Sequence, residues 1–92
     1  MEAPPDTHKP RLAAKARLKW DETRQKPLLL FPEGVLVLNP TAYEVLGLCD
    51  GQRTVEEIVK SLQERFGSAT IEQDVKTLLA RLVGKGLIVV AE

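Results

Sequence analysis

Two short apolar runs separated by a tight-turn sequence constrain this fold most. Residues 28–31 (Leu-Leu-Leu-Phe) and 35–38 (Val-Leu-Val-Leu) flank Pro32-Glu33-Gly34. Pro32 presets φ for a turn, and Gly34 accepts backbone angles that other residues resist, so the pattern predicts a β-hairpin. Both runs are apolar at successive positions, so one sheet face would pack on helices while the other meets something else.

A third strand is predicted before the hairpin. Apolar residues alternate with Lys15, Arg17 and Lys19 from Leu12 to Trp20, which is the period of a half-buried strand, and we place the strand at residues 16–21. Residues 1–11 hold three prolines among polar residues and have no apolar period. They are predicted to form a disordered tail, which leaves residues 12–92 as one domain.

Helix-start signals divide the second half of the chain into three helices. Asn39-Pro40 fits a capped helix over residues 40–50, with Gly51 as its stop. Capping-box patterns at Thr54 and Thr70 predict helices over residues 55–66 and 71–84. Residues 87–90 would form a short extended end. The expected fold is α+β and winged helix-turn-helix-like, with an N-terminal three-stranded antiparallel sheet followed by a three-helix bundle.

Composition excludes several classes of function. Thirteen Lys and Arg balance thirteen Asp and Glu, whereas a nucleic-acid-binding domain normally carries a basic excess. No apolar run approaches the length of a membrane span, and residues 1–10 lack the apolar core of a signal peptide. With a single cysteine and hence no internal disulfide, the expected location is the cytoplasm.

The side-chain inventory indicates a protein that is not an enzyme. The one histidine, His8, lies in the predicted tail, and the one cysteine, Cys49, lies on the helix expected to be buried. We therefore predict no catalytic residue, no metal site and no cofactor. Glu56 and Glu57 fall in the first turn of a helix, where carboxylates favour the positive end of the helix dipole.

Several segments together resemble one family. They are residues 17–21 (RLKWD), 32–39 (PEGVLVLN), 46–51 (ending in Cys-Asp-Gly), 54–59 and Asp74-Val75. At this spacing the chain resembles the pyrroloquinoline quinone (PQQ) biosynthesis protein D family, PqqD, over almost its whole length.

The resemblance implies a peptide chaperone. Family members bind the ribosomally made precursor peptide PqqA and present it to the radical S-adenosylmethionine (SAM) enzyme PqqE, which crosslinks a Glu and a Tyr of the peptide. Related recognition domains hold the peptide as an added strand on the third strand, against the third helix. The expected peptide-binding residues on the strand are Val35, Leu36, Val37, Leu38 and Asn39, because a sheet edge offers unpaired N–H and C=O groups.

The peptide would lie in a groove between the third strand and the third helix. Either of the two helix surfaces that flank the core-facing stripe, here called its shoulders, could form the helical wall of this groove. A helical wheel places Leu79 and Val83 on one shoulder of its core stripe and Asp74, Arg81 and Lys85 on the other. Lys76 completes the candidate set. Which shoulder faces the groove stays open, and Leu79 and Val83 could instead complete the core.

A winged-helix DNA-binding domain is the alternative, because three helices and a hairpin also serve that function. Its third helix would carry Glu72 and Asp74 beside its basic residues, and these carboxylates would repel phosphates. Monomer and dimer both stay open, because exposed apolar strands can pair between copies.

Overall fold

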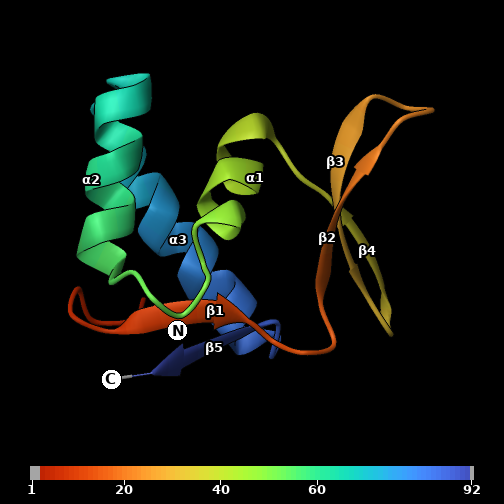
Figure 1. Cartoon of the computed structure of the whole chain (residues 1–92), viewed down its shortest axis with the longest axis horizontal. Coiled ribbons are helices and arrows are strands. Elements are labelled where there is room, and N and C mark those ends of the chain that lie inside the picture. The colour runs from red at the N-terminus through yellow and green to blue at the C-terminus, as the bar shows by residue number, and fades with distance from the viewer. Residues whose placement is uncertain (1–2, 92) are drawn as a thin grey trace.

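The computed structural model describes residues 3–91 as two antiparallel sheets and three helices (Figure 1). The elements follow the order β1 (Lys9–Leu12), β2 (Arg17–Asp21), β3 (Lys26–Phe31), β4 (Gly34–Val37), α1 (Pro40–Gly47), α2 (Val55–Phe66), α3 (Ile71–Gly84) and β5 (Ile88–Ala91). The predicted α+β class, with three helices and antiparallel pairing, is confirmed. The winged helix-turn-helix likeness stays a prediction.

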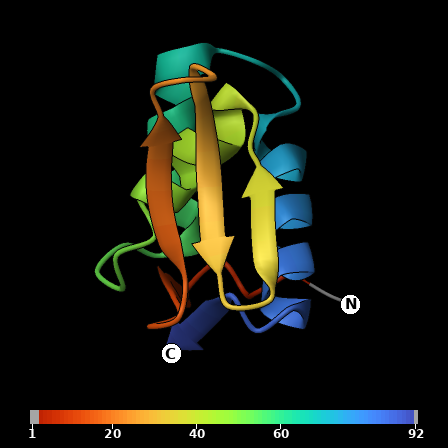
Figure 2. The same cartoon turned by 90° about the vertical axis from the view of Figure 1, so that its right-hand side faces the viewer.

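The predicted three strands are β2, β3 and β4, and they pair in that order as a layer beside the helices (Figures 1 and 2). In the register, Leu29 of β3 lies between Leu18 and Leu36. Leu29 is fully buried, and both neighbours pack against the core, so this row forms the inner face of the sheet. Trp20 of β2 lies against Tyr43 of α1, with ring centroids 6.1 Å apart.

The core is almost entirely aliphatic and lies between the three helices and the inner sheet face. Its fully buried side chains are Leu29, Val45, Leu46, Val55, Ile58, Leu62, Val75, Leu79, Leu82 and Leu87. Burial of each of these side chains stabilises the folded state by about 1.5–3 kcal/mol relative to an exposed position. These residues recur at helical spacing, which is why α2 and α3 form where the sequence predicts them.

The first two helices begin at the predicted caps. The Asn39 side chain accepts a hydrogen bond from the N–H of Ala42 (2.7 Å), with Pro40 in the first turn. Both halves of the capping box between Thr54 and Glu57 are formed, and Gly67 ends α2 with φ 65°. α1 is shorter than predicted because after Gly47 the backbone tightens into bonds between residues three apart, from Leu48 to Val45 and from Cys49 to Leu46.

The predicted capping box at Thr70 is wrong. Thr70 has φ −96° and ψ 0°, and its side chain makes no capping bond. A capping side chain reaches back to the helix amides from an extended backbone, which Thr70 lacks. Its hydroxyl instead donates to the Asp74 carboxylate (3.1 Å), while the Thr70 N–H donates to the Ser68 hydroxyl (3.2 Å).

The N-terminal segment differs from the predicted tail of residues 1–11, of which residues 1–2 lie outside the described part. Residues 9–12 form β1, which pairs antiparallel with β5, so the three-stranded sheet is neither N-terminal nor the only sheet. Pro10 is fully buried. The carbonyls of Asp6 and His8 accept hydrogen bonds from the N–H groups of Glu56 and Val55 (3.0 and 2.9 Å). The segment is therefore held mainly by backbone hydrogen bonds. Such bonds do not require apolar side chains at regular intervals, so the sequence shows no periodic signal for this segment.

Candidate peptide-binding groove

β4 is an edge strand, and the register shows which of its backbone groups are free. The Leu38 N–H donates to the Pro27 carbonyl (2.9 Å), which makes these two residues a hydrogen-bonded pair. Bonded and non-bonded pairs alternate along an antiparallel ladder, so Leu36 also bonds to β3. The N–H and C=O groups of Val35 and Val37 therefore point to the free edge, where a guest strand can pair with them.

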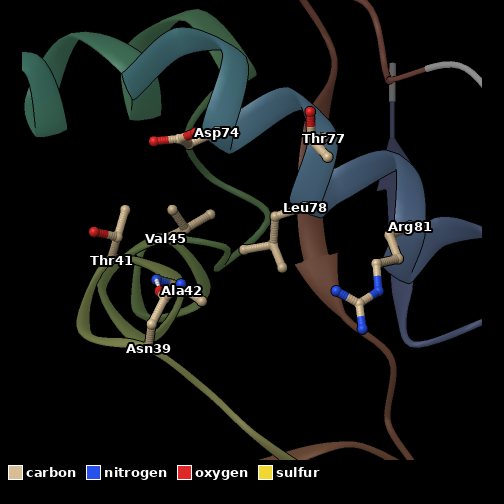
Figure 3. Close-up of a pocket in the computed structure, with 8 residues that line it drawn as sticks. All are labelled: Asn39, Thr41, Ala42, Val45, Asp74, Thr77, Leu78 and Arg81. Carbon is tan, nitrogen blue, oxygen red and sulfur yellow. Dashed lines mark hydrogen bonds between the residues drawn. The ribbon is translucent and has the colours of Figure 1, made fainter. Parts of the chain in front are cut away.

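α3 lies beside β4 (Figure 2). Two cavities between these elements and α1 form what we call the β4–α3 groove. A cavity of about 110 Å³ along the strand is lined by Leu36, Val37, Leu38, Asn39, Ala42, Leu78, Arg81 and Leu82. A wider one of about 300 Å³ lies between α1 and α3 and is lined by Asn39, Thr41, Ala42, Val45, Asp74, Thr77, Leu78 and Arg81 (Figure 3). Four lining residues are shared, so the two cavities form one continuous groove.

The groove has an apolar floor with polar groups around it. Leu78 projects from α3 toward α1, beside Ala42 and Val45 (Figure 3). Leu36 and Leu38 continue this apolar surface along β4. Such a surface can bury the side chains of an extended peptide, while the strand edge pairs with its backbone.

The two charged candidates, Asp74 and Arg81, lie at different positions along the length of the groove. Asp74 is in the first turn of α3 and Arg81 in the last. Seven residues correspond to about 10 Å along a helix axis, so the groove wall carries a carboxylate and a guanidinium two turns apart. No ion pair within residues 3–91 involves Arg81. A ligand that lies along the groove would meet these opposite charges in a fixed order.

Asp74 and Arg81 of the charged shoulder thus line the groove, whereas Lys85 and the other α3 candidates do not. Leu79 is fully buried in the core and Val83 packs against it. Lys76 lines a neighbouring cavity with Thr77 and Arg81 rather than the groove itself. It pairs with Glu72 (3.2 Å) and Asp6 (3.3 Å), whose hydrogen bonds raise its pKa. The candidate residues that the structure does bring together are Leu36, Val37, Leu38, Asn39, Asp74 and Arg81, with Val35 on the adjoining free edge.

Sequence reasoning missed the wall that α1 contributes and the central position of Leu78. In the sequence, Leu78 repeats at helical spacing with Val75 and Leu82, which is typical of a residue in the core stripe. It is only partly buried, however, because it lies at the margin of that stripe. Its spacing from Asp74 and Arg81 was the available signal, since residues three and four apart share one helix face. Thr41, Ala42 and Val45 reach the groove only through the packing of α1 on α3.

No histidine, cysteine or lysine is among the residues that line the groove. Cys49 is buried away from it, and its thiol donates to the Val45 carbonyl (3.2 Å). Burial, aided by the charge of Asp50, raises the pKa of Cys49 to about 12, so the thiolate that would act as a nucleophile is scarce at neutral pH. Among residues 3–91, no three His, Cys, Asp or Glu side chains are grouped to hold a metal ion.

Comparison with known proteins identifies the family. The family model for coenzyme PQQ synthesis protein D (PqqD) matches residues 28–88, which include β4, α1 and α3. The chain belongs to the PqqD family. None of the helices within residues 3–91 has the length and hydrophobicity to span a membrane.

Relatives of this PqqD family member match over most of their length. A PqqA binding protein of Rhodopseudomonas palustris (strain TIE-1) is 44% identical over 85 residues, covering 90% of this chain and 83% of the relative. A PqqA binding protein of Methylococcus capsulatus is 39% identical over 72 residues, covering 78% and 77%.

A solved structure has the same fold. The solution NMR structure of the PqqD part of Methylobacterium extorquens PqqCD, described as a functional and stand-alone recognition element for ribosomally synthesized and post-translationally modified peptides, matches with a TM-score of 0.74. It is 39% identical, and the match covers 87% of each chain.

Proposed function

We propose that this chain is a peptide chaperone of PQQ biosynthesis that binds the precursor peptide PqqA in the β4–α3 groove. It presents the peptide to the radical SAM enzyme PqqE for crosslinking of a Glu and a Tyr, and performs no catalysis itself. The observation that carries the proposal is the free edge of β4 beside an apolar groove, in a family whose named relatives are PqqA binding proteins.

The energetics require both walls of the groove. Val35 and Val37 offer four backbone groups, and four hydrogen bonds at about 1 kcal/mol net each would give only about millimolar affinity. Micromolar binding requires about 4 kcal/mol more. One or two large apolar side chains of the guest, buried against Leu36 and Leu78, would supply it.

An NMR titration of the labelled chain with the precursor peptide tests the proposal. Amide shifts should concentrate in residues 35–39 and on the face of α3 that holds Asp74, Leu78 and Arg81. The amides of α2, on the other side of α3 from the sheet, should stay nearly unchanged. Saturable shifts centred on α2 or β2 would place the peptide elsewhere, and the absence of any shift at millimolar peptide would reject binding.

A mass-spectrometric assay tests presentation. Peptide incubated with the chain and cofactors, but without the radical SAM enzyme, should keep its mass. With the enzyme present, crosslinking should be much faster when the chain is added. Crosslinking at the same rate without the chain would contradict the chaperone role.

A further inference from the structure

The face of the β2–β3–β4 sheet turned away from the helices is uncovered within the described chain (Figure 2). We call it the outer sheet face. Alternate residues of each strand project from it, because the intervening ones form the inner row around Leu29. Its members are Arg17, Lys19, Asp21, Lys26, Leu28, Leu30, Val35 and Val37. Asp21 is the one carboxylate among them, and it lies opposite Lys26 at one end of the face.

One half of this face is cationic. Arg17, Lys19 and Lys26 are exposed, and none takes part in an ion pair within residues 3–91. The segment 9–26 carries seven Lys or Arg against two acidic residues in a chain of zero net charge. Nearby Lys15 and Arg24, by contrast, each lie within 4 Å of a carboxylate, that of Glu33 or Asp21. The cations on the face are therefore free for an external partner.

The other half of the face is apolar and also exposed. Val35 and Val37 are 51% and 57% exposed, although both are β-branched side chains that favour burial. Leu28 lies between Lys19 and Val37 in the register and is only 8% exposed. It can be buried on an uncovered face because the aliphatic part of a neighbouring lysine covers apolar surface. The face thus has an apolar half on β4 and a cationic half on β2.

We infer that the outer sheet face docks an acidic protein surface with an apolar patch, and that this surface belongs to the radical SAM enzyme of the proposed function, on which the inference rests. Charge complementarity identifies the cationic half, because opposite potentials guide association between proteins. The exposed valines favour a protein over a nucleic acid, whose backbone offers phosphates and sugars to such a face.

Continuity with the groove gives this docking a role. A guest strand paired with the edge of β4 would extend the sheet by one strand, and its alternate side chains would project beside Val35 and Val37. An enzyme seated on the outer sheet face would then contact the chaperone and the peptide together. The other guest side chains would stay anchored in the groove.

The test compares charge reversals on two faces. The variant carries Arg17→Glu with Lys19→Glu, and the control carries Lys60→Glu with Lys85→Glu, which are also exposed, take part in no ion pair within residues 3–91 and lie off the sheet. The affinity of purified radical SAM enzyme for each chain is measured by titration at low and high salt. The outer-face variant should lose at least tenfold in affinity at low salt, whereas the control should change less than twofold.

Two further measurements separate the possible failures. Both variants should keep the parent's circular dichroism and its precursor-peptide affinity within twofold, and a milder variant with Arg17→Gln and Lys19→Gln should give a smaller loss of enzyme affinity. Unchanged enzyme affinity in the outer-face variant overturns the inference. Salt-dependent binding of random duplex DNA that only this variant loses, with enzyme affinity intact, also overturns it. If the parent binds enzyme but no peptide, the proposed function fails while the docking result stands.

Discussion

The Leu38 N–H and the Pro27 carbonyl, 2.9 Å apart, form a single hydrogen bond because Pro27 has no N–H to return. Because bonded and non-bonded pairs alternate along the β3–β4 ladder, this pair shows which backbone groups of β4 bond to β3. Those of Leu36 bond to β3, whereas those of Val37 point to the free edge.

Proline substitutions on β4 should therefore have opposite effects one residue apart. Val37→Pro removes an N–H from the free edge, where proline is tolerated, so the chain should fold but bind the precursor peptide at least tenfold more weakly. Leu36→Pro removes a bond to β3 and a core-facing side chain, so it should unfold the sheet. Circular dichroism and peptide titration measure both. Val37→Ala is the control for the lost side chain. If it weakens binding as much as Val37→Pro, strand pairing is not the cause.

Leu78 should contribute more to peptide binding than its neighbour Val83. Both are partly buried apolar side chains of α3, but only Leu78 lines the β4–α3 groove. Leu78→Ala should raise the Kd for the peptide about tenfold, which corresponds to about 1.4 kcal/mol, whereas Val83→Ala should change it less than twofold. Isothermal titration calorimetry checks the affinities. Equal losses in the two variants would argue against the groove as the binding site.

Removing the N-terminal segment should destabilise the domain. A chain that begins at Ala13 loses β1, which leaves β5 without its partner and the amides of Val55 and Glu56 without acceptors. Each lost bond is worth about 1 kcal/mol, and 1 kcal/mol shifts Tm by about 4–8 °C in a domain of this size. Thermal melts should show a fall of more than 10 °C, whereas deletion of residues 1–3 should have little effect. An unchanged Tm for the longer deletion would contradict the β1–β5 pairing.

The capping box of α2 should contribute to the acid sensitivity of the fold. Hydrogen bonds from the Thr54 N–H and hydroxyl lower the pKa of Glu57. A lowered folded-state pKa stabilises the fold above the unfolded pKa, about 4.3, and this stabilisation is lost as pH falls through the folded value. Urea unfolding should show that Glu57→Gln destabilises the chain at pH 7 and that the difference shrinks below about pH 4. A difference that stays constant down to pH 3 would show that the Glu57 charge has no such role.

Local signals were sufficient for much of the fold but not for the groove. The turn at Pro32 and the caps at Asn39 and Thr54 act on residues within four positions, so the sequence predicts them directly. The pairing of β1 with β5 joins residues about eighty apart through backbone groups that any side chain can accompany. Likewise, the helical wheel identified two shoulders of α3, but only the packing of α1 beside it shows that the shoulder with Asp74 and Arg81 faces the groove.

The β1–β5 sheet also has a kinetic consequence. Of the described strands, β1 leaves the ribosome first and β5 last, so during synthesis β1 must wait for nearly the whole domain before it can pair. Closing so long a loop carries a large entropic cost, whereas the β2–β3–β4 hairpins close short ones. We therefore expect the edge of β4, where we propose that the peptide binds, to form early, and the two ends of the described chain to come together as a late step of folding.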